Sequence, residues 1–320
     1  MQGFMQKKAS GGNGLGRRIW QARTAYCFLL PGILYLFIFR YIPIGGLTLA
    51  FRTYKANLGI WSSPWIGLEH FERLFITPKA IAAIWNTLVI SFSRLLLEFP
   101  VPILLAILFN EMRGKRVKRV YQTIVTFPHF LSWVIVATIL NDFFSTYGVM
   151  NHLIAMLGLP RVDFLTQPST FRLFVYFSSN WKEAGWSSII FIAALAGINS
   201  ELYEAAAMDG AGRLRRIWHV TLPGIRSTII IMLIMQIGQS MNAGFEQILS
   251  LKNPVVSDVV DIIDTYIYNI TFQATPNYGF STAVGLFKSL INCALLVAAN
   301  AVSNALMGQG IFGAGQEERA

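Results

Sequence analysis

Long apolar runs, separated by short charged segments, constrain this chain more than any other feature of its sequence. Six such runs lie at roughly residues 26–50, 81–109, 121–140, 171–196, 225–249 and 280–306. Each is long enough to cross the ~30 Å hydrocarbon core of a bilayer as a helix. Because backbone polar groups find no water there, each run must bond them internally. The sequence therefore predicts an all-α integral membrane protein with six transmembrane helices.

The composition supports a membrane chain and excludes a nucleic-acid binder. Only 13% of the residues are charged and the mean hydropathy is +0.51, whereas soluble domains carry about 25% charged residues. The net charge of +10 comes from Lys and Arg clustered between the apolar runs. Such clusters are typical of the positively charged loops of membrane proteins. We therefore expect membrane lipid, and no nucleic acid, around this chain.

The distribution of basic residues predicts the orientation. The segments 1–23, 110–119 and 200–226, together with the C-terminal tail, carry 15 Lys and Arg, against 7 on the opposite side. Because the more basic side of a membrane protein faces the cytoplasm, both termini are predicted to be cytoplasmic. The predicted organisation is a basic N-terminal segment (1–23), a six-helix membrane domain (24–308) and a cytoplasmic tail (309–320).

Motifs for catalysis and for cofactor binding are missing from the sequence. No Gly-x-x-x-x-Gly-Lys-Ser/Thr phosphate cradle occurs, since the pair Gly114-Lys115 is followed by Arg116. No Gly-x-Ser-x-Gly nucleophile elbow occurs either. The sequence thus predicts no catalytic residue, no metal site and no cofactor in this chain. The four histidines are isolated from one another: His70, His129, His152 and His219.

The segment 200–223 is a polar, glycine-punctuated stretch between two apolar runs. Asn199 or Ser200 can cap a helix start, and the alanines at 205–207 favour a helix with little side-chain bulk. Gly210 can end that helix in a left-handed turn. A second, basic helix is expected at about 213–221, ended by Pro223, which also starts the next span. From these residues alone, a docking element and a plain amphipathic connector are equally good interpretations.

The same segment resembles a known motif. Its residues are similar to the EAA loop of binding-protein-dependent ABC importer permeases, with Ile217 and Val220 in place of the more usual Phe and Ile. The outer-loop residues 66–71 and the pair Asn86-Thr87 resemble the carbohydrate-uptake branch of that family. Residues 40–43 look like the subgroup that imports complex oligosaccharides, including acidic ones such as alginate. The motif residues are Glu204, Ala205, Ala206, Asp209, Gly210, Ala211, Leu222 and Pro223.

The resemblance implies a fold, partners and a mechanism. The fold is that of a type I ABC importer permease in the bacterial inner membrane. The partners are a second, related but different permease, two ATPase subunits that hold ATP and Mg, and an extracytoplasmic solute-binding protein that delivers a saccharide. In the family, the loop lies in a cleft of the ATPase subunit, where the position of Glu204 meets a basic residue. The ATPase dimer then moves the spans through this loop.

Polar residues inside the spans are candidates for the substrate path, because polar groups in a membrane helix usually face the bundle interior. Amides can bond sugar hydroxyls, and a tryptophan can stack on a sugar face. Hydrogen bonding between helices is an equally good explanation for each of them. The pair Arg94 and Glu98 is interpreted as a structural ion pair in preference to the alternative, a role in transport. The path candidates are Asn180, Trp181, Lys182, Glu183, Trp186, Gln236, Gln239, Asn242, Glu246 and Asn292.

Two other classes of protein compete with an ATP-driven importer. A secondary transporter driven by an ion gradient also carries polar residues in its spans, but usually shows inverted repeats or more spans. It also leaves the segment 200–223 unexplained. In a structural or assembly membrane protein, the polar stripe at spacings of three and four in the fifth run (Gln236, Gln239, Asn242 and Glu246) would serve no purpose.

Overall fold

The computed structural model of this chain describes residues 20, 22–112, 114–273 and 275–307. Within these ranges every regular element is a helix, apart from two isolated β-bridges, Arg52–Trp65 and Lys55–Gly59. The predicted tail 309–320 lies outside the described residues, as does most of the predicted segment 1–23. The all-α prediction is confirmed.

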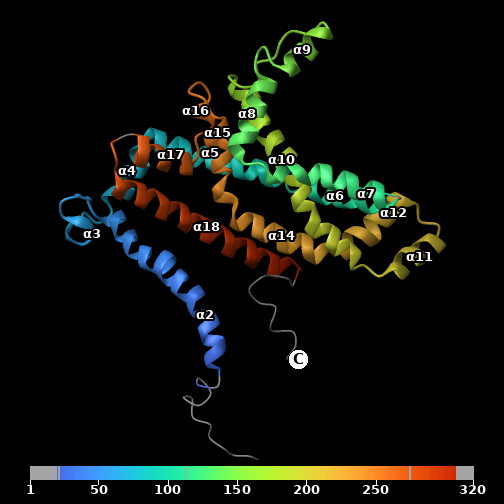
Figure 1. Cartoon of the computed structure of the whole chain (residues 1–320), viewed down its shortest axis with the longest axis horizontal. Coiled ribbons are helices and arrows are strands. Elements are labelled where there is room, and N and C mark those ends of the chain that lie inside the picture. The colour runs from blue at the N-terminus through green and yellow to red at the C-terminus, as the bar shows by residue number, and fades with distance from the viewer. Residues whose placement is uncertain (1–19, 21, 113, 274, 308–320) are drawn as a thin grey trace, which may run out of the picture.

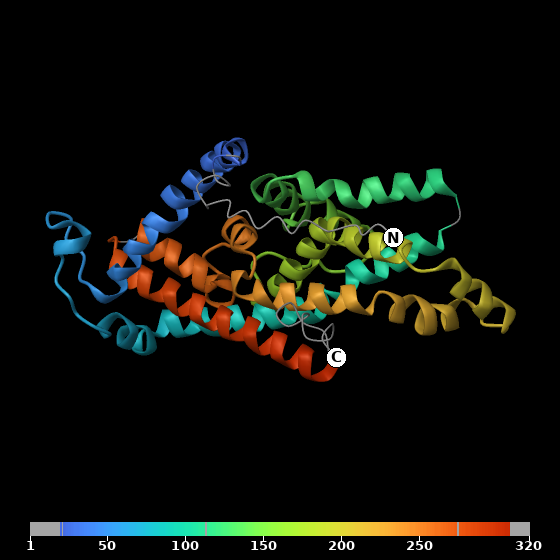
Figure 2. The ribbon, with the colours of Figure 1, turned by 90° about the horizontal axis from the view of Figure 1, so that it is seen from below.

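Long helical stretches that pack against one another form the body of the molecule (Figures 1 and 2). Helix α5 (Pro78–Leu97) continues into α6 (Pro100–Glu111), and α14 (Arg226–Gly238) packs against α18 (Tyr278–Met307). The 29-residue helix α10 (Pro168–Ala196) packs on α6. The short helices α3 (Gly59–Ser62) and α11 (Ser200–Met208) lie at opposite ends of this body (Figure 1).

Four helical stretches are long and apolar enough to cross a membrane: Arg23–Phe51, Pro78–Glu111, Trp133–Met156 and Tyr278–Ala305. Two further spans result when α10 and α14 are each counted with the shorter helices to which they are joined, at bends of 72° and 63°. The number of candidate spans thus reaches the predicted six.

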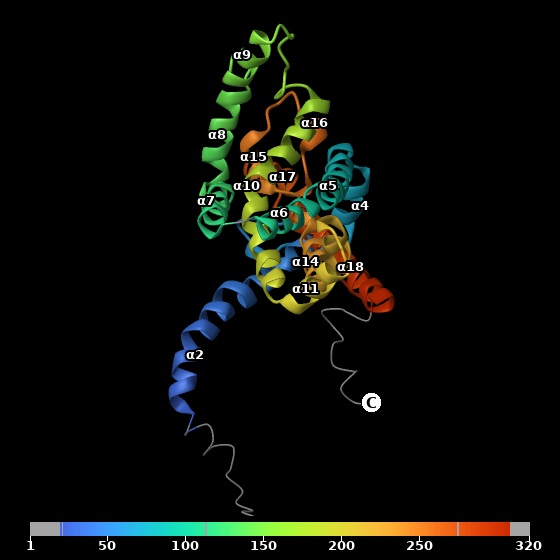
Figure 3. The same ribbon diagram turned by 90° about the vertical axis from the view of Figure 1, so that its right-hand side faces the viewer.

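The third predicted span is wrong in its bounds. The run 121–140 is not one helix: α7 (Lys115–Thr126) is followed by a 3-10 turn, Phe127–Phe130, and then by α8 (Trp133–Phe144). Pro128 has no N–H to continue a helix. Ser132 then caps α8 by accepting a hydrogen bond from the Ile135 amide at 3.3 Å. With α9 (Val149–Met156), α8 stands out from the body (Figures 1 and 3).

The fifth predicted span is also broken. Helix α14 ends at Gly238, a 3-10 turn covers Ser240–Asn242, and α15 begins only at Phe245 and ends at Leu251. Between them Ala243 and Gly244 adopt left-handed conformations, with φ of 40° and 78°. Such residues cannot continue a right-handed helix. The polar residues predicted on one face of a continuous helix are therefore divided: Gln236, Gln239 and Asn242 precede the break, and Glu246 follows it.

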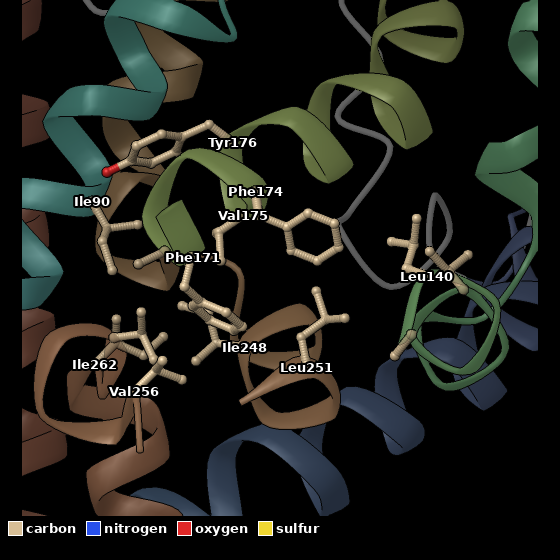
Figure 4. Close-up of a cluster of buried hydrophobic side chains, with 14 of the residues drawn as sticks. Ile90, Leu140, Phe171, Phe174, Val175, Tyr176, Ile248, Leu251, Val256 and Ile262 are labelled. Carbon is tan, nitrogen blue, oxygen red and sulfur yellow. The ribbon is translucent and has the colours of Figure 1, made fainter. Parts of the chain in front are cut away.

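The largest buried cluster joins α5, α8, α10 and α15 (Figure 4). Phe171, Val175 and Ile248 are almost completely buried in it. In a bilayer such contacts stabilise the bundle through close packing, because lipid tails are as apolar as the side chains. The cluster thereby fixes α15 against α10. It also contains Ile90, Val136, Ala137, Leu140, Phe144, Phe174, Tyr176, Ala243, Leu251, Val256, Val260 and Ile262.

The pair Asn86-Thr87 anchors the loop after α15 to α5. The Asn86 amide donates to the carbonyls of Asp258 (3.0 Å) and Asp261 (3.1 Å). The Thr87 hydroxyl accepts the amide of Ile263 at 2.8 Å. Backbone groups of an irregular loop need such partners when they are buried. Asn86 and Thr87, which contribute to the family resemblance, thus hold the loop against α5. The loop carries α16 (Ser257–Val260), α17 (Ile263–Tyr268) and a π-helical turn, Asn269–Gln273.

The first span stands apart from the body. Helix α2 (Arg23–Leu36) buries none of its residues and runs away from the other helices (Figures 1 and 3). It continues through a π-helical turn, Phe37–Tyr41, into a 3-10 stretch, Ile42–Phe51, that packs on α18. The following segment holds α3 (Gly59–Ser62) and α4 (Glu69–Ile76).

Candidate functional site

The segment 200–223 begins with a well-capped helix, α11 (Ser200–Met208). The Asn199 side chain accepts the Glu201 amide at 3.0 Å. At the other end, Gly210 has φ of 75°. The amide of Ala211 bonds the carbonyl of Ala206 at 2.9 Å, and that of Gly210 bonds Ala207 at 3.0 Å. This pair of bonds is a Schellman motif, which closes a helix through a left-handed residue. The left-handed stop predicted at Gly210 is confirmed.

A second helical stretch returns toward the body. It comprises α12 (Arg213–Arg216), a π-helical turn (Ile217–Thr221) and α13 (Leu222–Gly224). The Tyr203 hydroxyl, from α11, meets the buried hydroxyl of Thr221 at 3.1 Å. Pro223 differs from its predicted role, because it lies inside α13 and the long helix starts only at Arg226. Pro223 fits there because the first helical positions need no N–H donor.

The outer face of this helical pair is exposed at one end of the molecule (Figure 1). Several large apolar side chains of the pair are exposed, among them Met208 (88%) and Leu214 (74%). Of the motif residues, Glu204, Ala205, Asp209, Gly210 and Pro223 are exposed, and Ala206, Ala211 and Leu222 are half-buried.

A polar cavity of about 330 Å³ lies between α5–α6, α10 and α14. Four predicted path residues line it: Asn180, Glu183, Gln236 and Gln239. A second cavity, of about 130 Å³, lies at the break between α14 and α15, where Gln236 and Gln239 are joined by Asn242. Arg94 and Glu98 line both cavities.

Two other predicted path residues form a cluster beside the larger cavity. Lys182 is buried, and its Nζ donates to the His129 carbonyl (2.9 Å) and to Glu183 Oε1 (2.8 Å). The other carboxylate oxygen of Glu183 meets His129 Nδ1 at 2.6 Å. Trp186 stacks on the His129 ring at 4.5 Å between centroids. Trp181 is exposed and contributes to neither cavity.

Of the remaining predicted path residues, Asn292 and Glu246 line neither cavity, whereas Asn242 lines the smaller one and also bonds α18. Asn292, on α18, donates to the Gly238 carbonyl at 2.5 Å, which is a bond between two helices. Glu246 is exposed and lines neither cavity, because the break at Ala243 and Gly244 turns α15. Asn242 accepts a hydrogen bond from Lys288 at 3.1 Å.

The Arg94–Glu98 pair belongs to a buried network that the sequence interpretation missed. The two side chains approach to 3.6 Å. Arg94 Nη2 also donates to Gln247 Oε1, and Gln247 in turn donates to the Val175 carbonyl (2.7 Å) and to Ser178 Oγ (2.8 Å). Sequence spacing marks only the i,i+4 relation of the first two. Gln247 is one residue from the predicted Glu246, and only the helix break brings it inward.

With the helical arrangement established, comparison with known proteins identifies the family. Residues 98–308 match the family of the binding-protein-dependent transport system inner membrane component. This match covers well over half of the chain. The chain belongs to this family. It is an inner-membrane permease of an ABC transporter, and the ATPase activity resides in partner subunits.

Several relatives are similar to this permease over nearly their full length. Protein LplB of Bacillus subtilis (strain 168) is 46% identical over 290 residues, 90% of each chain. The polygalacturonan/rhamnogalacturonan transport system permease protein YteP of the same organism is 41% identical, over 92% of each chain.

Two solved structures also match this permease. A chain of a bacterial ABC transporter involved in the import of the acidic polysaccharide alginate has 41% identity and a TM-score of 0.85, covering 92% of this chain and 99% of that chain. A chain of a bacterial alginate ABC transporter in complex with alginate pentasaccharide-bound periplasmic protein has 40% identity and a TM-score of 0.86.

Gln247 provides a test of the buried network in this permease. We expect Gln247→Leu to lower the free energy of unfolding by about 1–3 kcal/mol, because it leaves a buried Arg94 donor without its partner and removes the hydrogen bonds to Val175 and Ser178. The measurement is the melting temperature of the purified complex, followed by size-exclusion chromatography after heating. Glu246→Gln, at the exposed neighbouring position, is the matched control. Equal melting of both variants would contradict a structural network around Gln247.

Proposed function

We propose that this permease, with a second related permease, forms the membrane path for an acidic oligo- or polysaccharide. An extracytoplasmic binding protein delivers the saccharide. Two ATPase subunits, which hold ATP and Mg, drive the transport through the segment 200–223. The proposed location of both termini is the cytoplasm, supported by the excess of Lys and Arg on that side.

The similarity to the alginate importer carries this proposal. That chain is 41% identical to this one, with a TM-score of 0.85 over 92% of this chain and 99% of that chain. The relative YteP, named for polygalacturonan and rhamnogalacturonan transport, is also 41% identical to this chain. Alginate, polygalacturonan and rhamnogalacturonan are acidic polysaccharides, which favours an acidic rather than a neutral saccharide for this chain.

The lining of the larger cavity supports a saccharide. Three amide side chains, Asn180, Gln236 and Gln239, face it. An amide both donates and accepts, which suits hydroxyl groups. The two carboxylates on its wall are each close to a cation, Glu98 to Arg94 and Glu183 to Lys182. We assign the sugar-facing role to the three amides and to Glu183. We assign Lys182 and Trp186 to positioning Glu183 and His129.

The geometry of segment 200–223 supports the coupling role. Two short helices are joined to the long helices α10 and α14 at bends of 72° and 63°. A force on the exposed end is therefore applied to two helices that line the cavity. The Tyr203–Thr221 hydrogen bond lets the pair move as one body. We assign ATPase contact to the exposed Glu204, Ala205, Asp209 and Gly210.

Reconstitution tests the proposal. The permease is purified with its sister permease and ATPase subunits, placed in proteoliposomes and supplied with the binding protein. We expect ATP-dependent uptake of oligouronates, such as oligogalacturonate or oligomannuronate. Uptake of neutral oligosaccharides alone would overturn the acidic substrate. Uptake that follows an ion gradient without ATP would overturn the coupling mechanism and favour a secondary transporter.

A further inference from the structure

Arg94 stands out among the cations of the helix bundle because its hydrogen bonding is incomplete. Lys182, Lys288 and Arg172 each make at least two hydrogen bonds of 2.7–2.9 Å to oxygen atoms. Arg94 has a single hydrogen-bond partner among the described residues, the neutral amide of Gln247. Its Nε is buried and makes no hydrogen bond within the described structure.

Glu98 leaves the complementary gap. Its Oε2 accepts from Ser179 at 2.9 Å, but its Oε1 is buried and accepts no hydrogen bond from a described residue. The two atoms without partners, Arg94 Nε and Glu98 Oε1, lie 3.6 Å apart. That distance balances the charges but exceeds the length of a hydrogen bond. A buried ion pair whose remaining donors and acceptors are unsatisfied is expensive to keep.

The guanidinium is nevertheless held in place. A Cβ at Gly244 would lie 2.5 Å from both terminal nitrogens of Arg94, so a side chain at this position would displace the guanidinium. Gly244 also has φ of 78°, which glycine adopts without strain. Gln247, held by Val175 and Ser178, fixes Nη2 from the other side. The break between α14 and α15 is therefore shaped around the Arg94 head group.

Both cavities open onto this pair. Arg94 and Glu98 line the larger cavity together with Asn180, Gln236 and Gln239, and also line the smaller one. A molecule in either cavity meets the Arg94 side chain, whose buried Nε has no hydrogen-bond partner among the described residues. A carboxylate is the group that matches two parallel N–H donors of a guanidinium. A neutral sugar offers no acceptor of that charge and shape.

We propose that Arg94 binds a carboxylate of the saccharide, exchanging its loose contact with Glu98 for a bidentate one. Glu98 Oε1 then accepts a hydrogen bond from a hydroxyl of the same sugar. This assigns recognition of the acid group to Arg94, and it rests on the proposed function, since it requires an acidic saccharide. It replaces the interpretation of Arg94 and Glu98 as a purely structural ion pair.

A double variant separates the two roles. Arg94→Gln with Glu98→Gln removes both charges, so a purely structural pair is replaced without leaving a buried charge. We expect this variant to assemble with its partners, and its uptake of oligogalacturonate to fall about tenfold or more, because a carboxylate loses its bidentate partner. Uptake within about twofold of wild type would overturn the proposal. A twofold change corresponds to ~0.4 kcal/mol, which is too small for the loss of a carboxylate-binding residue.

A second variant keeps the test decisive if the double variant does not assemble. Arg94→Lys retains the positive charge beside Glu98 but loses Nε and the planar fork. We expect uptake of oligogalacturonate to fall about fivefold or more, with a raised KM for the loaded binding protein, since a lysine binds a carboxylate only as a point charge. Wild-type behaviour of Arg94→Lys would overturn the proposal.

The failure of this inference is distinct from the failure of the proposed function. The wild-type complex is assayed first, with oligogalacturonate and with a neutral oligosaccharide. If wild type imports only the neutral sugar, the proposed acidic substrate is wrong, and the role of Arg94 is wrong with it. If wild type imports the oligouronate and the Arg94 variants do so equally well, only the role of Arg94 is wrong.

Discussion

Replacing Gly210 with valine is expected to uncouple ATP hydrolysis from transport. Gly210 has φ of 75° and forms the Schellman turn between the two short helices of segment 200–223. A left-handed conformation costs an L-residue about 1–2 kcal/mol, and a β-branched residue is least tolerant of it. The turn must then open or shift, which moves Glu204 and Asp209 out of register with an ATPase subunit.

The measurement is ATP-driven uptake and ATPase activity of the assembled complex in proteoliposomes. We expect uptake to fall about tenfold or more in Gly210→Val, because a turn of the wrong shape cannot transmit force to the long helices. Gly212→Ala is the matched control. Gly212 has φ of −66°, and an added Cβ meets no atom within 4 Å. Wild-type uptake together with full substrate-stimulated ATPase activity in Gly210→Val would contradict the coupling role.

Gly185→Ala is expected to disrupt the packing of α10 against α7. A Cβ at this position would lie 2.9 Å from the backbone nitrogen of Thr126 and closer still to the carbonyl group of Val125. Because these are backbone atoms, no side-chain rotation relieves the clash, and the two helices must separate. Overpacking of this kind costs about 1–3 kcal/mol and sometimes more. The same shift displaces His129, which follows α7, from Glu183.

Thermal melting of the purified complex and its yield from membranes measure this effect. We expect a melting temperature several degrees lower and a smaller fraction of assembled complex for Gly185→Ala. The control is Gly197→Ala at the end of the same helix, where an added Cβ meets its nearest atom at 3.4 Å, an ordinary contact. If the complexes of the two variants have the same melting temperature, the close approach of α7 and α10 does not limit the thermal stability of the complex.

Patterns local in sequence allowed much of the fold to be predicted. The first span and the last agree closely with Arg23–Phe51 and Tyr278–Met307, because an apolar run of bilayer length has few alternatives to a helix. The left-handed stop at Gly210 was equally predictable, since helix ends of this kind favour glycine. These features depend on a few neighbouring residues.

The lining of the two cavities was predicted less completely, because helix breaks redirect the side chains. A continuous fifth span would place Gln236, Gln239, Asn242 and Glu246 on one face, as the periodicity indicated. Left-handed Ala243 and Gly244 interrupt that face, so Glu246 is exposed and Gln247 is buried. Gly244 alone is an ambiguous signal, since glycine also occurs inside membrane helices. The break is recognisable only from the packing of Arg94 against it.

Most of the membrane helices, the polar segment 200–223 with its turn at Gly210, and the family resemblance could be predicted from the amino-acid sequence. Each of these follows from hydrophobicity, backbone conformation or motif spacing within one stretch of chain. Which polar residues meet depends instead on the folded chain. It brings Arg94 of α5, Ser179 of α10 and Gln247 of α15 to one network, although the first and last are 153 residues apart. Hydrogen-bond satisfaction depends on such distant neighbours, so it cannot be read from local pattern.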